Sequence, residues 1–163
     1  IALTVGVIVL ALAQLAAKAR PAARTGQAAP APKPTDAVFV SYARANETFV
    51  LPVIDAAKRL GRNFWVDQKG GVNSGDGWAG EIVGAIRGSA GVVVMCSKAA
   101  FESDHVKREV YLADRYKKKL APVFVEAAEP PEDFEYFFAG VQPLKLFETP
   151  EAERPQALIR VLG

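Results

Sequence analysis

Short apolar runs alternate with longer amphipathic segments from residue 37 to the end of the chain. Runs rich in valine, phenylalanine and other strand-forming residues predict β-strands at 37–40, 63–66, 91–96, 120–125 and 144–147. Apolar residues repeated every three to four positions predict helices at 47–60, 78–87, 106–116 and 151–162. The Gly- and Asn-rich stretch 67–77 predicts a loop, and the proline-led stretch 129–139 predicts irregular structure. This alternation predicts a three-layer α/β domain, with a parallel sheet of five strands covered by helices on both faces.

Residues 1–17 carry no charge and are almost entirely apolar, and three basic residues, Lys18, Arg20 and Arg24, follow them. As a helix this stretch is about 25 Å long, near the short limit for a bilayer span. Basic residues beside an apolar helix favour a cytoplasmic location for that side. We therefore predict a single transmembrane anchor over residues 1–20. The chain opens on Ile1 rather than methionine, so this span could extend further. A secretory signal peptide is the alternative, because residues 17–19 fit a small-x-small cleavage site.

A linker is predicted over residues 21–35, which contain four prolines among alanine, glycine, threonine and glutamine. Such a segment favours extended polyproline II structure and reaches on the order of 45 Å. The remaining residues, 36–163, form one predicted domain, which is large enough to bury a core of its own.

Charge and composition exclude several functional classes. Residues 1–35 carry four basic residues and no acid, whereas residues 36–163 carry 16 basic and 18 acidic residues. The folded part therefore has no basic excess, which argues against a nucleic-acid partner. A single cysteine, Cys96, excludes an intramolecular disulfide framework and a multi-cysteine metal site. With 50% hydrophobic and 23% charged residues, the chain resembles neither a disordered protein nor a multi-helix membrane protein.

Ligands of open parallel sheets bind beyond the carboxyl ends of the strands. The residues there are 41–44, Asp67 with its loop, and 96–97. Residues 75–80 spell G-x-G-x-x-G, but they do not directly follow a strand, so we interpret the match as chance. A phosphoacceptor receiver domain would place carboxylates after the first and third strands. Serines, Ser41 and Ser97, stand there instead, and this class is set aside.

His105 and Glu109 lie four residues apart, so they share one face of the predicted helix. His105 is the only histidine, no cluster with metal-ligand spacing accompanies it, and no G-x-S-x-G motif indicates a nucleophile. From the residue pattern alone, His105 is interpreted as a half-exposed residue at a helix start. Glu109 is interpreted as a solvated acid paired with a neighbouring base, and Glu81 as an acid at a helix N-terminus.

Several stretches in order resemble the Toll/interleukin receptor (TIR) domain family. They are AVFVSYARANE (37–47), FWVDQKGGVNSGDGW (64–78), WAGEIVGAI (78–86), GVVVMCSKAAFESDHVKREVYLA (91–113), LAPVFVE (120–126) and FFAGVQPLKLF (137–147). The resemblance covers residues 36–163 and implies a flavodoxin-like fold with a five-stranded parallel sheet. The alanine-rich composition favours a bacterial-type member.

The resemblance implies two kinds of function. Many TIR domains cleave NAD⁺ to nicotinamide and ADP-ribose or a cyclic form of it, whereas others are adaptors that act through TIR–TIR contacts. The catalytic acid of the enzymes ends a serine–aromatic–glutamate pattern, which maps onto Ser103, His105 and Glu109. The aromatic position is most often tryptophan in the family. The other substrate-binding positions map onto Tyr42, Ala43, Arg44, Asp67 and Trp78.

We therefore expect a membrane-anchored NAD⁺ nucleosidase in defence or signal transduction, active as a self-associated oligomer and needing no metal or cofactor. The alternative is a non-catalytic scaffold that binds other TIR domains. Retention of Glu109, Trp78 and Arg44 favours the enzyme, and histidine at position 105 favours the scaffold.

Overall fold

The computed structural model describes residues 35–67 and 77–162 of the chain. The predicted anchor, all but the last residue of the predicted linker, and most of the 67–77 loop lie outside the described residues. Within the described ranges, no helix has both the length and the hydropathy required to cross a bilayer. The predicted membrane span therefore stays a prediction.

The described domain is a five-stranded parallel sheet with the strand order β2-β1-β3-β4-β5. This confirms the predicted fold class. The elements in chain order are β1 (Val38–Ser41), η1 (Arg44–Asn46), α2 (Glu47–Arg59), β2 (Phe64–Val66), α3 (Trp78–Gly88), β3 (Gly91–Cys96), α4 (Lys98–Glu102), α5 (Asp104–Arg115), β4 (Leu120–Phe124), α6 (Glu132–Phe138), β5 (Leu144–Lys145), η2 (Leu146–Glu148), η3 (Glu151–Glu153) and α7 (Arg154–Arg160).

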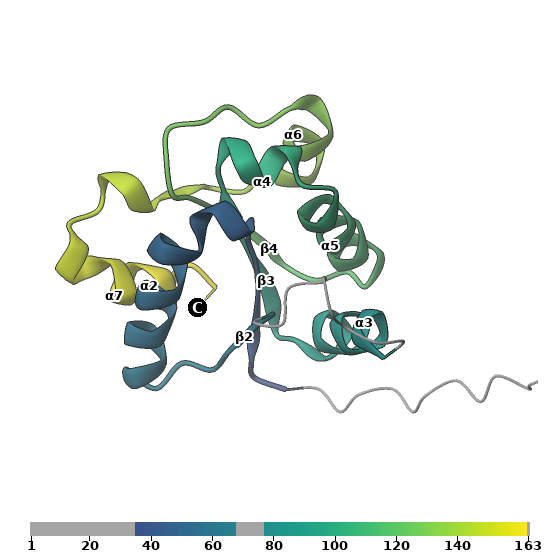
Figure 1. Cartoon of the computed structure of the whole chain (residues 1–163), viewed down its shortest axis with the longest axis horizontal. Coiled ribbons are helices and arrows are strands. Elements are labelled where there is room, and N and C mark those ends of the chain that lie inside the picture. The colour runs from purple at the N-terminus through teal and green to yellow at the C-terminus, as the bar shows by residue number, and fades with distance from the viewer. Residues whose placement is uncertain (1–34, 68–76, 163) are drawn as a thin grey trace, which may run out of the picture. The chain divides into compact units, whose positions relative to one another are not determined.

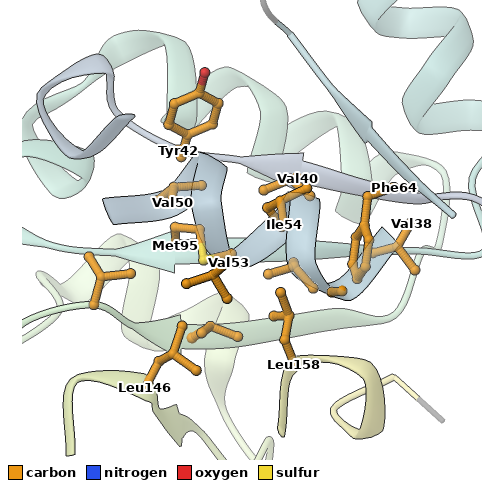
Figure 2. Packing of buried hydrophobic residues seen from close by; sticks show 14 of the residues in the cluster. Val38, Val40, Tyr42, Val50, Val53, Ile54, Phe64, Met95, Leu146 and Leu158 are labelled. Carbon is orange, nitrogen blue, oxygen red and sulfur yellow. The ribbon is translucent and has the colours of Figure 1, made fainter. Parts of the chain in front are cut away.

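Helices cover both faces of the sheet, with α2 and α7 on one side and α3 and α5 on the other (Figure 1). Successive side chains of β1 point to opposite faces, because the side-chain period of a strand is two. Val38 and Val40 therefore pack under α2 and α7 (Figure 2), whereas Phe39 packs against Ile86 of α3 and its neighbours. All six residues of β3 are buried, as expected for a central strand of a covered parallel sheet.

The prediction of irregular structure over residues 129–139 is wrong, because α6 occupies Glu132–Phe138. Pro131 takes the position just before the helix, where a missing N–H costs nothing. Phe134 and Phe138 lie one turn apart and both enter the core.

Two serines that cap helices explain further differences between the predicted and the observed helices. Ser97 caps α4, a helix absent from the prediction, by accepting a hydrogen bond from the Ala100 N–H at 2.9 Å. Ser103 caps α5 in the same way, so α5 begins at Asp104 rather than at residue 106. The last strand is shorter than predicted, because the chain turns into a 3₁₀ helix that buries Leu146.

Candidate functional site

A cavity of about 280 Å³ lies at the carboxyl end of β1, close to the first residues of α3 and α5. It is lined by Val40, Tyr42, Arg44, Asp67, Trp78, Ser103, His105 and Glu109. The chain leaves β1 for β2 on one side, while β3 pairs with β1 on the other, so the cavity lies at the point where the strand order reverses. This is where open α/β sheets bind ligands. Seven of the eight predicted site residues line this cavity, and their roles remain predictions.

Glu109 is a buried acid, with only 3% of its surface exposed. Its Oε2 accepts a 2.5 Å hydrogen bond from the Ser41 hydroxyl at the end of β1. Its Oε1 lies 2.9 Å from Nε2 of His105, one turn back on α5. The interpretation of Glu109 as a solvated acid is therefore wrong. A buried carboxylate with polar partners on both oxygens is a group that the fold holds in place, because an unpartnered one would be costly.

The side chain of His105 contacts both the Glu109 carboxylate and the indole ring of Trp78. Its imidazole stacks on the indole of Trp78, with centroids 5.1 Å apart and planes inclined by 19°. The side chain is 36% exposed, which confirms the expected half-exposed histidine at a helix start. The hydrogen bond with Glu109 raises the pKa of His105, and burial opposes that shift. Asp67, with Oδ2 4.0 Å from Nε2 of His105, raises this pKa further. Both acids thus favour the protonated form of the imidazole more than water does.

Asp67 connects the end of β2 to the same cavity. Its Oδ2 accepts a 3.3 Å hydrogen bond from Nε1 of Trp78, and its backbone oxygen accepts one of 3.3 Å from the Tyr42 hydroxyl. Burial of the phenol is the main cause that raises the pKa of Tyr42. The phenol therefore remains neutral and able to donate at physiological pH.

Arg44 lines the cavity and is partly exposed to solvent. Its Nη1 is 3.1 Å from Oε1 of Glu47, in a pair whose side chains are 46% and 40% exposed. An exposed ion pair of this kind contributes about 0–1 kcal/mol, so the guanidinium can exchange Glu47 for a phosphate at little cost.

Two further residues differ from the sequence expectations. Ala43 does not line the cavity, because its side chain packs into the core on the α3 and α5 side of the sheet. The sequence pattern places Ser41 only at a strand end, whereas in the structure it is fully buried and bonded to Glu109. A signal for it exists in the sequence: Ser41 lies two residues after Phe39, so a polar group occupies a core-facing strand position.

Glu81, the other acid considered from the sequence, is in a different place. It lines a separate hollow with Thr35, Ala37 and Trp65, near the start of β1. Across residues 35–67 and 77–162, no group of three or more histidine, cysteine, aspartate or glutamate side chains is arranged to hold a metal ion. The expectation that no metal takes part stays a prediction.

Comparisons with known proteins place this geometry in a family. The family model described as "TIR domain" matches residues 38–160. The TIR domain of the Toll-related receptor TRR-2 from Hydra magnipapillata superposes with a TM-score of 0.61 at 20% identity, covering 77% of this chain and 96% of that chain. A metazoan TIR-STING receptor from C. gigas gives a TM-score of 0.52 at 20% identity, covering 77% of this chain and 41% of that chain. No curated protein matches the sequence. The two structures share the fold, the family model spans nearly all of the described domain, and the chain belongs to the TIR domain family.

Proposed function

We propose that this TIR domain cleaves NAD⁺ at the bond between nicotinamide and ribose. The observation that carries the proposal is the buried carboxylate of Glu109, which lines a cavity beside the stacked rings of Trp78 and His105. In the reaction, the C1′–N1 bond breaks and its electron pair passes to the pyridinium nitrogen, so nicotinamide leaves as a neutral base. Water then adds to the ribosyl cation and loses a proton, which gives ADP-ribose. Capture by another nucleophilic atom of the same molecule would give the cyclic product.

Glu109 would act on the positive charge that develops on the ribose. Because nicotinamide leaves as a neutral molecule, the step needs no general acid, and the largest demand is stabilisation of the ribosyl cation. A carboxylate held in place beside the ribose would supply this, as the second carboxylate of glycosidases does. The Ser41 hydrogen bond holds that carboxylate, so Ser41 is a positioning residue.

The other cavity residues would bind the substrate. Trp78 offers a ring surface to the nicotinamide, Tyr42 and Ser103 shape the cavity, and the partly exposed Arg44 pairs with a phosphate. The cavity volume is just below the usual range for ligand pockets, roughly 300–1,000 Å³. It therefore suits the nicotinamide riboside part, with the remainder of the dinucleotide extending past Arg44.

Membrane attachment and self-association belong to the same proposal. The apolar residues 1–17 and the basic residues after them favour a single-pass anchor with the TIR domain in the cytoplasm, where NAD⁺ is available. TIR domains commonly associate with one another, and an anchor with a long linker raises their local concentration. We therefore expect activity to rise with surface density.

One observation favours the alternative, a scaffold that binds other TIR domains without catalysis. The position where the enzymes of the family most often carry tryptophan is His105, and its Nε2 contacts the Glu109 carboxylate at 2.9 Å. If this contact persists with NAD⁺ present, the imidazolium of His105 offsets the negative charge of the carboxylate. The domain then acts only through its contacts with other copies.

The deciding experiment measures nicotinamide release from NAD⁺ by the full chain reconstituted in vesicles at several surface densities. The variants are Glu109→Gln and, as the matched control, Glu81→Gln. We expect Glu109→Gln to lower the rate about 10³-fold, since the amide keeps the shape and removes the charge. Glu81→Gln changes an exposed acid outside the cavity, and we expect the wild-type rate.

Each other result has a definite meaning. Release that survives in Glu109→Gln contradicts the assigned acid. Absence of release from folded, clustered wild-type chain contradicts the enzyme and supports the scaffold, which is then tested by concentration-dependent association of the same reconstituted chain.

A further inference from the structure

Basic and acidic residues are distributed unevenly between the two ends of the described domain. In a parallel α/β fold every helix runs opposite to the strands, so helix ends gather where the strands begin. We call the end of the described domain where the strands begin the amino edge. Its basic residues are Lys58, Arg59, Arg62, Arg87, Arg115, Lys117, Lys118, Lys119 and Arg160, and its acids are Asp36, Asp55, Glu81 and Asp114. The remaining described residues include 13 acids and six basic residues.

Contacts between chain segments bring the ends of α3, α5 and α7 together at this edge. Nζ of Lys118 donates a 2.8 Å hydrogen bond to the backbone oxygen of Ser89, which ties the end of α5 to the end of α3. The backbone oxygen of Lys119 and the side chain of Leu162, after α7, both lie against Gly91 at the start of β3. Figure 1 shows the chain entering β1 at this end of the sheet.

The acids of the amino edge do not cancel its charge. The Asp36 carboxylate accepts hydrogen bonds of 3.0 and 2.9 Å from Nδ2 of Asn63. Asp114 lies 4.0 Å from Nζ of Lys117, whose side chain remains 83% exposed. Helix dipoles favour basic residues in a last turn, but they do not account for Arg62 or for residues 117–119, which lie beyond the helix ends.

A large apolar side chain lies exposed at the amino edge. Leu60, the residue that ends α2, is 58% exposed and follows Arg59 directly. An exposed apolar side chain with basic residues close by in the sequence suits the boundary between lipid headgroups and acyl chains.

The chain also enters the domain at the amino edge. The backbone N–H of Thr35 donates a 2.8 Å hydrogen bond to the oxygen of Gly88, at the end of α3. The apolar residues 1–17 precede this point by fewer than 20 residues, which span about 55 Å as polyproline II.

We propose that the amino edge docks on an anionic lipid bilayer, with Leu60 at the headgroup level and the basic residues on lipid phosphates. The cavity, at the opposite end of the strands, then faces away from the membrane. This inference concerns a different surface from the cavity, and it does not depend on the cleavage of NAD⁺.

Hydrogen exchange of the full chain in vesicles tests the docking. One set of vesicles contains phosphatidylcholine alone, and the other contains phosphatidylcholine with phosphatidylserine. At low salt we expect amides in residues 58–63 and 115–119 to exchange at least about five-fold more slowly on the anionic vesicles, since one basic residue near such a surface contributes roughly that factor. High salt should remove the difference.

A pair of variants with equal charge change provides the control. Arg59→Glu with Lys119→Glu reverses two exposed charges of the amino edge, whereas Lys98→Glu with Lys145→Glu does so near the carboxyl ends of β3 and β4. We expect only the first pair to abolish the slowing, with both variants unfolding at similar temperatures. Equal slowing on both vesicle types, equal loss in both variants, or slowing by a DNA duplex but not by vesicles would each overturn the proposal.

Discussion

The two ends of the sheet differ in structure and in charge, although the same strands form both. At the amino edge, helices pass into strands through short turns. Backbone hydrogen bonds join the starts of neighbouring strands there, from the N–H of Val92 to the oxygen of Lys119 and from the N–H of Ala90 to the oxygen of Ala37. At the carboxyl ends, side chains from β1, the end of β2, α3 and α5 converge on one cavity. The first end is basic and the second acidic. The difference suggests that substitutions at the carboxyl ends change chemistry, whereas those at the amino edge change stability or membrane contact.

Ser41→Ala should give the largest effect among the variants that test this contrast. It removes the hydroxyl that donates to Oε2 of Glu109 and leaves the carboxylate with one partner, His105. A hydrogen bond to a charged group contributes about 1.5–3 kcal/mol. We therefore expect kcat for nicotinamide release to fall about 10- to 100-fold, with KM changed less than about three-fold. Steady-state kinetics of the reconstituted full chain measures both quantities.

Ser97→Ala is the matched control, because Ser97 is also fully buried and directly follows the neighbouring strand. Its hydroxyl donates to Oδ1 of Asn46 at 2.7 Å and caps α4. Its loss should cost about 1 kcal/mol of unfolding free energy and leave kcat within about two-fold. A larger effect on kcat from Ser97→Ala than from Ser41→Ala would contradict the positioning role.

Strand and helix periodicity was sufficient to predict the sheet, because each strand falls in a short apolar run and each long helix has one apolar face. The prediction failed for short helices whose formation depends on a capping side chain or on a proline before the first turn. The two prolines before Glu132 suggested irregular structure, although a proline before the first turn is compatible with the helix that Phe134 and Phe138 anchor.

The site was predicted from the family resemblance rather than from physics alone. Even so, the α5 sequence contains a signal for the buried acid. Val106, Val110 and Ala113 form the buried face of α5, and Glu109 falls on that face three residues after Val106. The contacts of Glu109 with Ser41 and of His105 with Trp78 join residues far apart in the sequence, so only the three-dimensional structure provides them.

Gly61→Ala tests whether a change at the amino edge lowers the stability of the fold and leaves the rate of catalysis unchanged. Gly61 has a φ of +94°, and a Cβ there would meet nothing within 4 Å. The cost is therefore backbone strain alone, about 1 kcal/mol, since L-residues other than glycine disfavour this region. We expect the midpoint of thermal unfolding to fall by about 3–5 °C. Nicotinamide release at 25 °C should be unchanged, and a loss of activity in the folded variant would break the proposed separation of the two ends.

His105→Asn should give the smallest effect, and one that depends on pH. The hydrogen bond with Glu109 raises the pKa of His105, Asp67 adds to this, and burial and Arg108 oppose it. The protonated imidazole therefore stabilises the native state below the unfolded-state pKa of about 6.5, and that contribution disappears as pH rises through the higher native pKa. The 36% exposure of the imidazole limits the contribution to below about 1 kcal/mol.

Urea unfolding of both chains at pH 5.5 and pH 8.5 measures this contribution, and the stability gap between wild type and His105→Asn should be larger at pH 5.5. Repeating the pair in a Glu109→Gln background closes a double-mutant cycle. There the pH dependence of the gap should shrink, because the amide removes the charge that favours the imidazolium. A gap that is equal at both pH values would show that the contact between His105 and Glu109 is not an ion pair in solution. In that case His105 would offset less of the negative charge of Glu109 than the 2.9 Å contact suggests. This result would favour the enzyme over the scaffold.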